Sequence, residues 1–338
     1  VTDTTTLVAS GHDITLDRAG NNFATVIITS GGDVDLRDTN AIILGASAVS
    51  GTYDLRAGGA VTQSGDLAIT GVTTLVAGSN AITLDRAGNN FATVIITSGG
   101  NVALRDAGAI ILGAATVSGT YSVTAGGAVT NSDTQEITGI TTISASSHNV
   151  TLDTATNNFA NEVRITGAAV TVVDEDGIEL GASTVSGTYT VTATAGDITN
   201  SGALIITGAS IFTIGVNGSD IVLGETTNAF SNSVTLKAGS GGGGTFGDIT
   251  FVDSEGAVDL DSSASANGDL FLDALANGAV GGALSITADG DFTQNVDLVV
   301  TDTTTLVASG HDITLDRAGN NFATVIITSG GDVDLRDT

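Results

Sequence analysis

The sequence DITLDRAGNNFATVIITSGG occupies Asp13–Gly32, returns with one substitution at 81–100, and returns unchanged at 312–331. The phenylalanine within this stretch marks a regular spacing along the chain, at Phe23, Phe91, Phe159, Phe230 and Phe322, with intervals of 68, 68, 71 and 92 residues. A fixed period of this length is the signature of a protein built by stacking one structural unit.

A longer period contains the shorter one. Val1–Thr39 has the same sequence as Val300–Thr338, an offset of 299 residues. We therefore divide the chain into repeats 23–90, 91–158, 159–229 and 230–321, with 322–338 beginning the next period. Because residue 1 falls inside a repeat, we expect 1–338 to be one continuous segment taken from a longer protein.

Composition favours an all-β fold. Hydrophobic residues make up 41% of the chain and are mostly Val, Ile, Leu and Ala, beside abundant Thr, while Pro, Cys, Met and Trp are absent. Such residues favour strands. Short alternating runs such as DVDL and AITLD are separated by Gly, Asn, Asp or Ser, which indicates strands joined by tight turns. This pattern predicts a parallel β-solenoid.

The turn-bounded pieces set the expected number of coils. The first repeat divides at its turns into 23–47, 48–71 and 72–90, so we expect three coils per 68-residue repeat. The 92-residue repeat equals one repeat plus a 24-residue coil, which gives 13 coils per 299 residues. At about 4.8 Å per coil the axial period is roughly 62 Å. Stacks of Val, Ile and Leu are predicted to fill the interior: Ile14, Val34, Val61, Ile82, Val102, Val129, Val150 and Val170.

Charge stacking provides a check on this register. If Ile14 lies beside Val34, then Asp17 lies over Arg37 and Arg18 over Asp38. The next repeat places Asp85 over Arg105 and Arg86 over Asp106 in the same way. Opposite charges on neighbouring strands are modestly stabilising.

Several stretches resemble a known group of proteins. These are ITLDRAGNNF, IILGASAVSGTYDLRAGGAVTQSGDLAITG and LGASTVSGTYTVTATAGDITNSGALIITG. They are similar to the repeats of filamentous-haemagglutinin-like exoproteins, giant bacterial surface and secreted adhesins, many of them exported by two-partner secretion. The similarity covers most of the chain and weakens in 231–279. It implies a right-handed parallel β-helix and export across the outer membrane, and it carries over no binding residue.

Two acidic turns contain the candidate metal ligands. VDEDGIEL (173–180) offers Asp174, Asp176 and Glu179, and VDSEGAVDLD (252–261) offers Asp253, Glu255 and Asp259. Carboxylate oxygens suit Ca²⁺, but neither turn matches an EF-hand or a glycine-rich calcium repeat. We therefore expect solvated turn carboxylates and no cofactor, with calcium as the alternative, tested by the effect of a chelator on the thermal midpoint.

Other candidate sites have structural interpretations. The glycine run at Lys237–Asp248 lacks the Gly-Lys-Ser/Thr end of a phosphate loop, so we expect a loop bulging from one coil. His12 and His148 share a repeat position with Asn80, which indicates a polar turn. The Asn21-Asn22 pair is expected to turn the chain, because Asn tolerates left-handed angles, and the recurring phenylalanines to fill the core. The last candidate is a sparse row of tyrosines at one repeat position that could bind sugar rings: Tyr53, Tyr121 and Tyr189.

The composition also limits the function. A net charge of −28, with only 9 Lys and Arg, argues against nucleic acid, and no apolar run reaches the 18 or more residues of a membrane span. Acidic residues mostly recur with the repeat, whereas glycosidases and lyases gather theirs in one cleft, so we expect no enzyme. We expect the structural shaft of an extracellular bacterial filament or giant adhesin, whose partner is the next copy of itself, either in the same chain or in a second chain stacked end to end. The alternative is a multivalent module that binds surface glycans.

Overall fold

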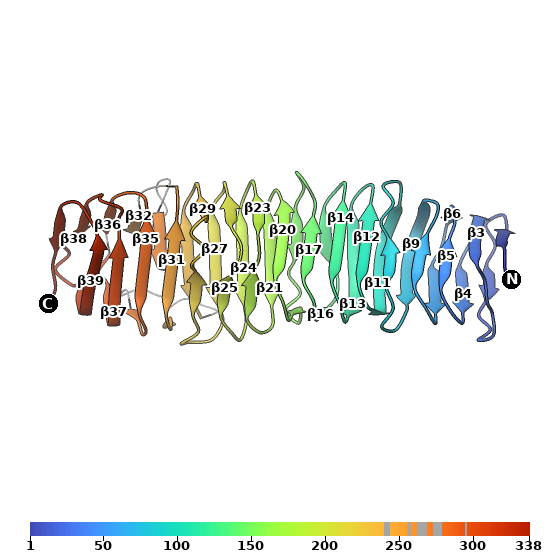
Figure 1. Ribbon diagram of the computed structural model, residues 1–338, viewed down its shortest axis with the longest axis horizontal. Helices are drawn as coiled ribbons and strands as arrows, with labels where there is room; N and C mark the ends of the chain where they lie inside the picture. Colours follow the sequence, from blue (N-terminus) through green and yellow to red (C-terminus); the bar gives the residue numbers. More distant parts are fainter. Residues whose placement is uncertain (240–243, 256–257, 262–268, 273–278, 295) are drawn as a thin grey trace. The chain divides into compact units, whose positions relative to one another are not determined.

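The computed structural model describes residues 1–239, 244–255, 258–261, 269–272, 279–294 and 296–338, with only the backbone in 258–261 and 269–272. Every regular element in these residues is a β-strand, so none of their segments is a helix that could cross a membrane. The chain forms two compact units, Val1–Asn161 and Glu162–Thr338. Each unit is a β-solenoid of parallel strands, as the sequence predicts (Figure 1).

In Val1–Asn161 the chain alternates between two parallel sheets. The first sheet pairs, in order, β1 (Thr4–Val8), β3 (Thr25–Ser30), β5 (Ile42–Leu44), β8 (Val61–Gln63), β10 (Ile82–Leu84), β12 (Val102–Asp106), β14 (Tyr121–Ala125) and β17 (Thr141–Ser144). The second sheet pairs β2 (Ile14–Leu16), β4 (Val34–Asp38), β7 (Tyr53–Ala57), β9 (Leu67–Val76), β11 (Asn90–Gly99), β13 (Ile110–Val117), β15 (Val129–Asn131) and β18 (Val150–Leu152). Three short strands extend it: β6 (Ser47–Val49), β16 (Gln135–Ile137) and β19 (Asn158–Phe159).

Glu162–Thr338 has the same organisation. Its first sheet contains β20 (Val163–Gly167), β22 (Ile178–Leu180), β25 (Ile198–Asn200), β28 (Ile221–Leu223), β31 (Ile249–Asp253), β35 (Leu284–Ala288), β37 (Val299–Val307) and β39 (Asn321–Ser329), with β23 (Ser183–Val185), β26 (Leu204–Ile206), β29 (Ala229–Phe230) and β34 (Ala279–Val280). Its second sheet contains β21 (Val170–Asp174), β24 (Tyr189–Ala193), β27 (Ser210–Ile214), β30 (Val234–Ala238), β33 (Asp269–Leu272), β32 (Val258–Asp261), β36 (Phe292–Gln294), β38 (Ile313–Leu315) and β40 (Val333–Leu335).

The strand register gives the length of one coil. In the second sheet Ile14 lies beside Val34, Val34 beside Tyr53, and Tyr53 beside Thr73. These successive partners are almost evenly spaced along the chain. A coil therefore takes about 20 residues and crosses both sheets once, with a rise of about 4.8 Å.

This coil length corrects the expected count. Ile14, Ile82 and Val150 occupy one position of three successive repeats, and they lie in the second, the first and again the second sheet. A 68-residue repeat thus makes about three and a half coils, and three per repeat and 13 per 299 residues were too few. The reason is that both sides of a coil carry the same strand-and-turn pattern, so turn residues mark half coils as readily as whole ones.

The predicted interior residues are all buried, and they are divided between the two sheets. Ile14 and Val34 pair in the second sheet, whereas Val61, Ile82 and Val102 follow one another in the first. The predicted core role of the recurring phenylalanines is confirmed, since all five are buried: Phe23, Phe91, Phe159, Phe230 and Phe322. In the second unit the ring of Phe230 stacks on that of Phe251, with centroids 5.4 Å apart.

The fourth repeat does not insert a whole coil. Ile249 of β31 lies directly beside Leu284 of β35, so the first sheet gains no strand between them. The additional strand is in the second sheet alone, where β33 pairs with β30 and β32, and β32 pairs with β36. The expected insertion of one 24-residue coil was therefore wrong, because the extra residues make two strands on one side of a single coil.

The predicted charge stacking is also wrong in its partners, although the register of Ile14 beside Val34 is confirmed. Arg86 pairs with Asp66 of the preceding coil at 2.8 Å. Asp38 and Asp106 are 3% and 2% exposed and face the turn backbone instead of an arginine. A carboxylate at the inner end of a strand is closer to amide groups than to a long side chain on the outer surface.

Candidate functional site

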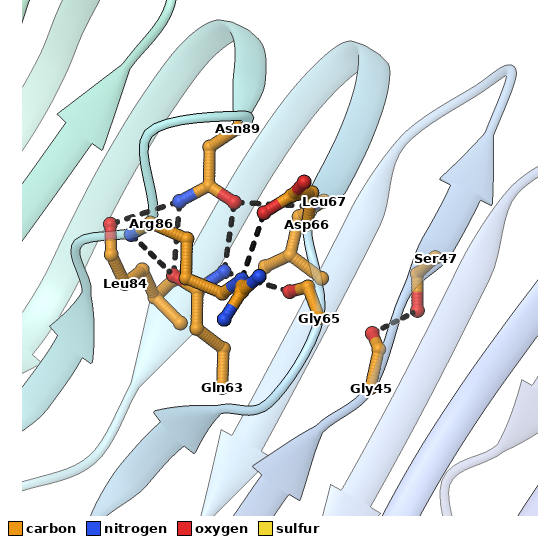
Figure 2. A network of polar contacts seen from close by, with 9 residues as sticks. All are labelled: Gly45, Ser47, Gln63, Gly65, Asp66, Leu67, Leu84, Arg86 and Asn89. Carbon is orange, nitrogen blue, oxygen red and sulfur yellow. Dashed lines mark hydrogen bonds and ion pairs between the residues drawn. The ribbon is translucent and has the colours of Figure 1, made fainter.

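Buried asparagines in the turns that follow β10, β18, β28 and β38 join neighbouring coils. Asn89 is fully buried, and Figure 2 shows its four hydrogen bonds. Its Nδ2 donates to the carbonyl of Leu84 at 3.1 Å and to Oε1 of Gln63 at 2.9 Å. Its Oδ1 accepts from Nε2 of Gln63 at 2.7 Å and from the backbone N–H of Leu67 at 2.9 Å. One carboxamide thus closes its own turn and holds the coil before it.

The same arrangement, which we call the asparagine latch, recurs along the chain. Asn228 donates to the carbonyl of Leu223 and accepts from the N–H of Leu204 and from Nδ2 of Asn200. The latch asparagines are fully buried: Asn89, Asn157, Asn228 and Asn320. Their side-chain partners in the preceding coil are Gln63, Asn131, Asn200 and Gln294. The signal in the sequence is a Thr followed by Gln or Asn, 26 or 28 residues before the latch.

Asn21 occupies the latch position just before the first full repeat and is only half-buried, with one side-chain bond, from Nδ2 to the carbonyl of Leu16 at 2.8 Å. The expected left-handed backbone is absent at both Asn21 and Asn22. Left-handed angles occur instead at Ser10 and Ser146, with φ of 53° and 51°. The asparagines therefore act through hydrogen bonds, and the serines turn the chain.

A second link between coils is made by the strand-end aspartates, which are buried at the last position of a strand, as Asp38 is in β4 and Asp106 in β12. The N–H of Phe91 donates to Oδ2 of Asp106 at 2.5 Å, and the N–H of Gly108 donates to its Oδ1 at 2.7 Å. Asp38 receives the N–H groups of Phe23 and Asn40 in the same way. Burial raises the pKa of Asp106, and the two backbone hydrogen bonds partly offset that rise.

The calcium candidates divide between these structural roles and the surface. Asp174 is fully buried and accepts the N–H of Asp176 at 2.9 Å, while Glu179 is exposed in β22. Asp174 is therefore not the solvated turn carboxylate that the sequence suggested, because its turn folds over it.

The second acidic turn is similar. Asp253 is 5% exposed and accepts the N–H groups of Phe230 and Glu255, both at 3.1 Å. Burial raises its pKa, the backbone hydrogen bonds lower it, and the nearby Glu255 carboxylate raises it. Glu255 accepts from Oγ of Ser231 at 2.7 Å, and the side chain of Asp259 lies outside the described residues. Among the residues whose side chains are described, no three His, Asp or Glu come together as metal ligands.

The three tyrosines are core residues. Tyr53 and Tyr189 are fully buried and Tyr121 is 1% exposed, so these side chains do not form a surface row that could bind sugar rings. Each tyrosine lies beside a Thr or Ser of the next coil, as Tyr53 does beside Thr73, and the small neighbour leaves room for the ring. Burial raises the pKa of all three phenol groups above the ordinary value of 10.

The remaining sequence candidates are turns. His148 Nδ1 lies 3.3 Å from the carbonyl of Ala145 within its own turn, as expected for a polar turn residue. The glycine run at Lys237–Asp248 falls partly outside the described residues, at 240–243.

Sequence reasoning missed a ladder of aspartates, each of which directly precedes a strand of the first sheet, β25, β28 or β31. Asp197 accepts the N–H of Asp220 at 2.8 Å, Asp220 accepts that of Asp248 at 2.6 Å, and Asp248 accepts that of Ala283 at 2.8 Å. Asn101 does the same for Thr120 in the second repeat. The signal was an Asp or Asn directly before the first inward Ile or Val of these strands.

A coupled substitution inside the repeats was also missed. Ser47 accepts the N–H of Ile28 and donates to the carbonyl of Gly45, and Ser183 makes the equivalent bonds. The second repeat has Ala115 at this position. There Gln135 of the next coil, where the first repeat has Leu67, donates to the carbonyl of Gly113 at 2.7 Å.

Together these groups bond coil to coil. In each case the acceptor or donor is a backbone group of a neighbouring coil or turn, which is the requirement for stacking units without leaving buried polar groups unpaired.

Comparison with known proteins identifies one family. The family model described as "Repeats of unknown function (DUF5649)" matches residues 1–30, 31–98, 99–166, 167–237 and 263–329. No curated protein and no solved structure matched the chain.

Proposed function

The chain belongs to a family of repeats of unknown function (DUF5649), and we propose that it is a structural shaft segment of an extracellular bacterial filament or giant adhesin. That it is a repetitive β-solenoid is plain from the fold. The shaft role, the surface location and the continuation into further 299-residue periods of the same chain are the proposal.

The observation that carries this proposal is what the recurring polar and aromatic residues do. The latch asparagines, the strand-end aspartates and the tyrosines all point inward or between coils. The residues that recur in the repeat are therefore those that hold neighbouring coils together, and a rod-like shaft requires such contacts. Solvent-facing acidic residues, in a chain of net charge −28, keep such a protein soluble and discourage sideways association.

A length series tests the proposal. Proteins with one, two and three copies of the 299-residue period would be imaged by electron microscopy as rods carrying a fused globular marker. Each added period of about 14 coils, which is four repeats of about three and a half coils, should lengthen the rod by roughly 67 Å. This value replaces the axial period of roughly 62 Å expected from 13 coils. Lengths that do not increase linearly would refute the shaft, and antibody that fails to label intact cells would refute the surface location.

A second candidate function rests on one surface feature. An outer groove of about 310 Å³ in the first repeat is lined by Ile27, Thr29, Ser47, Ala48 and Asp66. Thr29 and Asp66 supply a hydroxyl and a carboxylate to this groove, which are groups that bind sugar hydroxyls, whereas the Ser47 hydroxyl is already bonded within the protein. A glycan array with the chain and with Ala48→Arg, which fills the groove, tests it. Binding that the substitution abolishes would support the binding module. If neither protein binds a glycan, the shaft remains as the proposed function.

A further inference from the structure

The outer face of four neighbouring strands in Glu162–Thr338 is almost free of charge, although the chain has a net charge of −28. β21 pairs with β24, β24 with β27 and β27 with β30, and no register shift interrupts these pairings. The outward side chains therefore form two straight rows, in which every residue is partly exposed. We call this surface the neutral face, and its rows are Thr171, Thr190, Ile211 and Thr235, and Val173, Thr192, Thr213 and Lys237.

The same face is charged in the first repeat. There Arg56 pairs with Asp35 at 3.0 Å. The outward residues of β4 and β7 are Asp35, Arg37, Asp54 and Arg56. The third repeat has uncharged residues at all four positions, whereas the inward Tyr53 returns as the buried Tyr189. A coil thus accepts either set of outer residues. The third repeat has the set that is easier to cover, because an unpaired charge is costly to bury.

Little charge lies beside the two central strands of the neutral face. Between Glu179 and Asp220, a stretch that includes β24 and β27, the only charged residue is Asp197, in the turn before β25 of the other sheet. Val216, just after β27, is 47% exposed. By contrast, the uncharged outer face of β31 and β35 is bordered by acidic turn residues, which include Asp248, Glu255 and Asp289.

Two charged residues lie at opposite ends of the neutral face. Glu175 follows directly after β21, the first of the four strands, and Lys237 is the last outward residue of β30, the fourth. Both lie at the carboxyl ends of their strands. A negative and a positive group placed in this way match each other when two such faces meet with one of them turned end for end. The surface that matches the neutral face is therefore the neutral face of a second copy of this chain.

The two charges also decide how such a pair is arranged. Two sheets that pack face to face keep their strands nearly aligned, about 10 Å apart. With a two-fold axis parallel to the strands, β21 of each chain lies across β30 of the other, and Glu175 faces Lys237. With a two-fold axis along the stacking direction, each charge would face the uncharged start of a strand, at Ala169 or Ser233. Only the first of these arrangements pairs opposite charges.

We propose that the neutral face is a lateral docking site for a second copy of this chain, with β21 of one copy across β30 of the other. Two chains of net charge −28 repel one another, and contact through this face keeps their acidic turns apart. The contact is isologous, so it closes at two chains. The inference concerns contact between chains and goes beyond the shaft role, which requires no such contact.

The size of the neutral face sets the strength of the contact. Four strands about 4.8 Å apart, each with five residues of about 3.3 Å, cover roughly 300 Å² on each chain. A stable complex buries about 800 Å² on each partner. The contact is therefore weak and forms at high chain concentration or between chains that are held side by side.

Cysteine cross-linking tests the arrangement, because the chain has no cysteine of its own. Chain with Thr171→Cys would be mixed at millimolar concentration with chain carrying Thr235→Cys and treated with a short bis-maleimide. In the proposed pair these two positions face each other at about 10 Å, whereas two copies of the same position are about 17 Å apart. We expect at least about fivefold more cross-linked dimer from the mixture than from either chain alone. Equal yields, or no dimer, would overturn the proposal.

Sedimentation equilibrium of a charge variant tests the contact itself. The first repeat supplies its four substitutions, Thr171→Asp, Val173→Arg, Thr190→Asp and Thr192→Arg. They leave the net charge unchanged and allow the ion pair seen between Arg56 and Asp35 to form again. The control places the same charges on the acid-bordered face of the other sheet, with Thr250→Asp, Val252→Arg, Ser285→Asp and Thr287→Arg. Circular dichroism and the urea midpoint check that both variants are folded.

We expect the parent chain and the control to dimerise at millimolar concentration. The neutral-face variant should associate at least about tenfold more weakly, because docking would bury unpaired charges. Full association of the neutral-face variant, an equal loss in the control, or absence of a parent dimer would each overturn the proposal. If either variant does not fold, the cross-linking result decides.

Discussion

The asparagine latch should contribute far more to stability where a coil lies beneath it than where none does. Replacing Asn89 by Ala removes the acceptor of the Leu67 N–H and a donor to the Leu84 carbonyl. It also removes both bonds to the Gln63 amide, which keeps its bond to the Gly65 carbonyl. All of this happens at a residue that is fully buried. A buried polar group left unpaired costs about 1–3 kcal/mol. The expected loss in the free energy of unfolding is therefore about 3–5 kcal/mol.

The chain supplies its own control at the same repeat position. Asn21 is half-buried and its side chain makes one bond, to the carbonyl of Leu16. Replacing Asn21 by Ala should cost only about 1 kcal/mol. Asn89→Asp is a third, nearly isosteric variant. It should resemble Asn89→Ala, because a buried carboxylate oxygen would face the carbonyl of Leu84, which can only accept.

Urea unfolding of the three variants and the parent chain measures these differences, and hydrogen exchange locates them. The Leu67 amide, which donates to Asn89 at 2.9 Å, should lose its protection in Asn89→Ala and keep it in Asn21→Ala. Equal costs for Asn89→Ala and Asn21→Ala, or an unchanged Leu67 amide in Asn89→Ala, would refute the reasoning. In that case the latch would be a turn residue with no part in holding coils together.

Four further predictions concern single features. Gln135→Leu should destabilise the chain by about 1–3 kcal/mol by removing the donor to the Gly113 carbonyl. Adding Ala115→Ser, which recreates the Ser47 arrangement, should recover at least half of that in a double-mutant cycle. Ser146→Gly should stabilise by about 1 kcal/mol, measured by urea unfolding, because Ser146 has φ of 51° and the preceding repeat has Gly78 at this position with φ of 60°. Asp220→Asn should change stability by less than about 0.5 kcal/mol, since its oxygen still accepts the Asp248 N–H, whereas Asp220→Ala should cost about 1 kcal/mol. The three tyrosines are the only ones in the chain, so absorbance at alkaline pH should show none ionising near pH 10 in the folded protein. Because their folded pKa is raised, the stability they contribute is complete below the unfolded value and is lost as pH rises above it. Tyrosines that ionise near pH 10 while the chain stays folded would contradict their burial.

The fold class could be predicted from the sequence because the alternation of apolar and polar residues identifies the inward face of each strand. Ile82 and Leu84 are fully buried with Thr83 between them facing outward, and the same alternation in nearly every repeat makes a parallel stack of strands the simplest structure. The parallel solenoid and the core position of the phenylalanines are confirmed. The right-handed path of the chain stays a prediction from resemblance.

The candidate site was harder to predict, because its chemistry depends on which coil lies beside which. Asp38 and Arg18 look like a surface pair when only the residue types and the register are known. Asp38, however, follows Val34 and Leu36 on the inward face of β4, and its carboxylate accepts the N–H of Phe23 at 2.5 Å. Gln63 and Asn89 are 26 residues apart, and only the turn between their coils brings the two amides together. Periodicity along one strand contains no information on such corner contacts.

Because each 68-residue repeat makes about three and a half coils, one repeat position lies in opposite sheets in successive repeats. This half-coil offset allows the inward-facing and outward-facing residues of the repeats to be compared. Ile42 and Ile110 are inward-facing equivalents, in the first and second sheets, and both are buried, as is Ile178 in the third repeat. The adjacent outward residue is Ile43 in the first repeat and Ile111 in the second, 40% and 41% exposed, and an exposed glutamate, Glu179, in the third. A ligand that binds the outer face of one sheet would contact the same repeat positions only in alternate repeats. Selection for binding would therefore keep the outward-facing residues of alternate repeats alike. The first and third repeats differ there while their inward residues agree. This is the pattern expected when the requirement on the repeat is to stack, and it favours the shaft over the binding module.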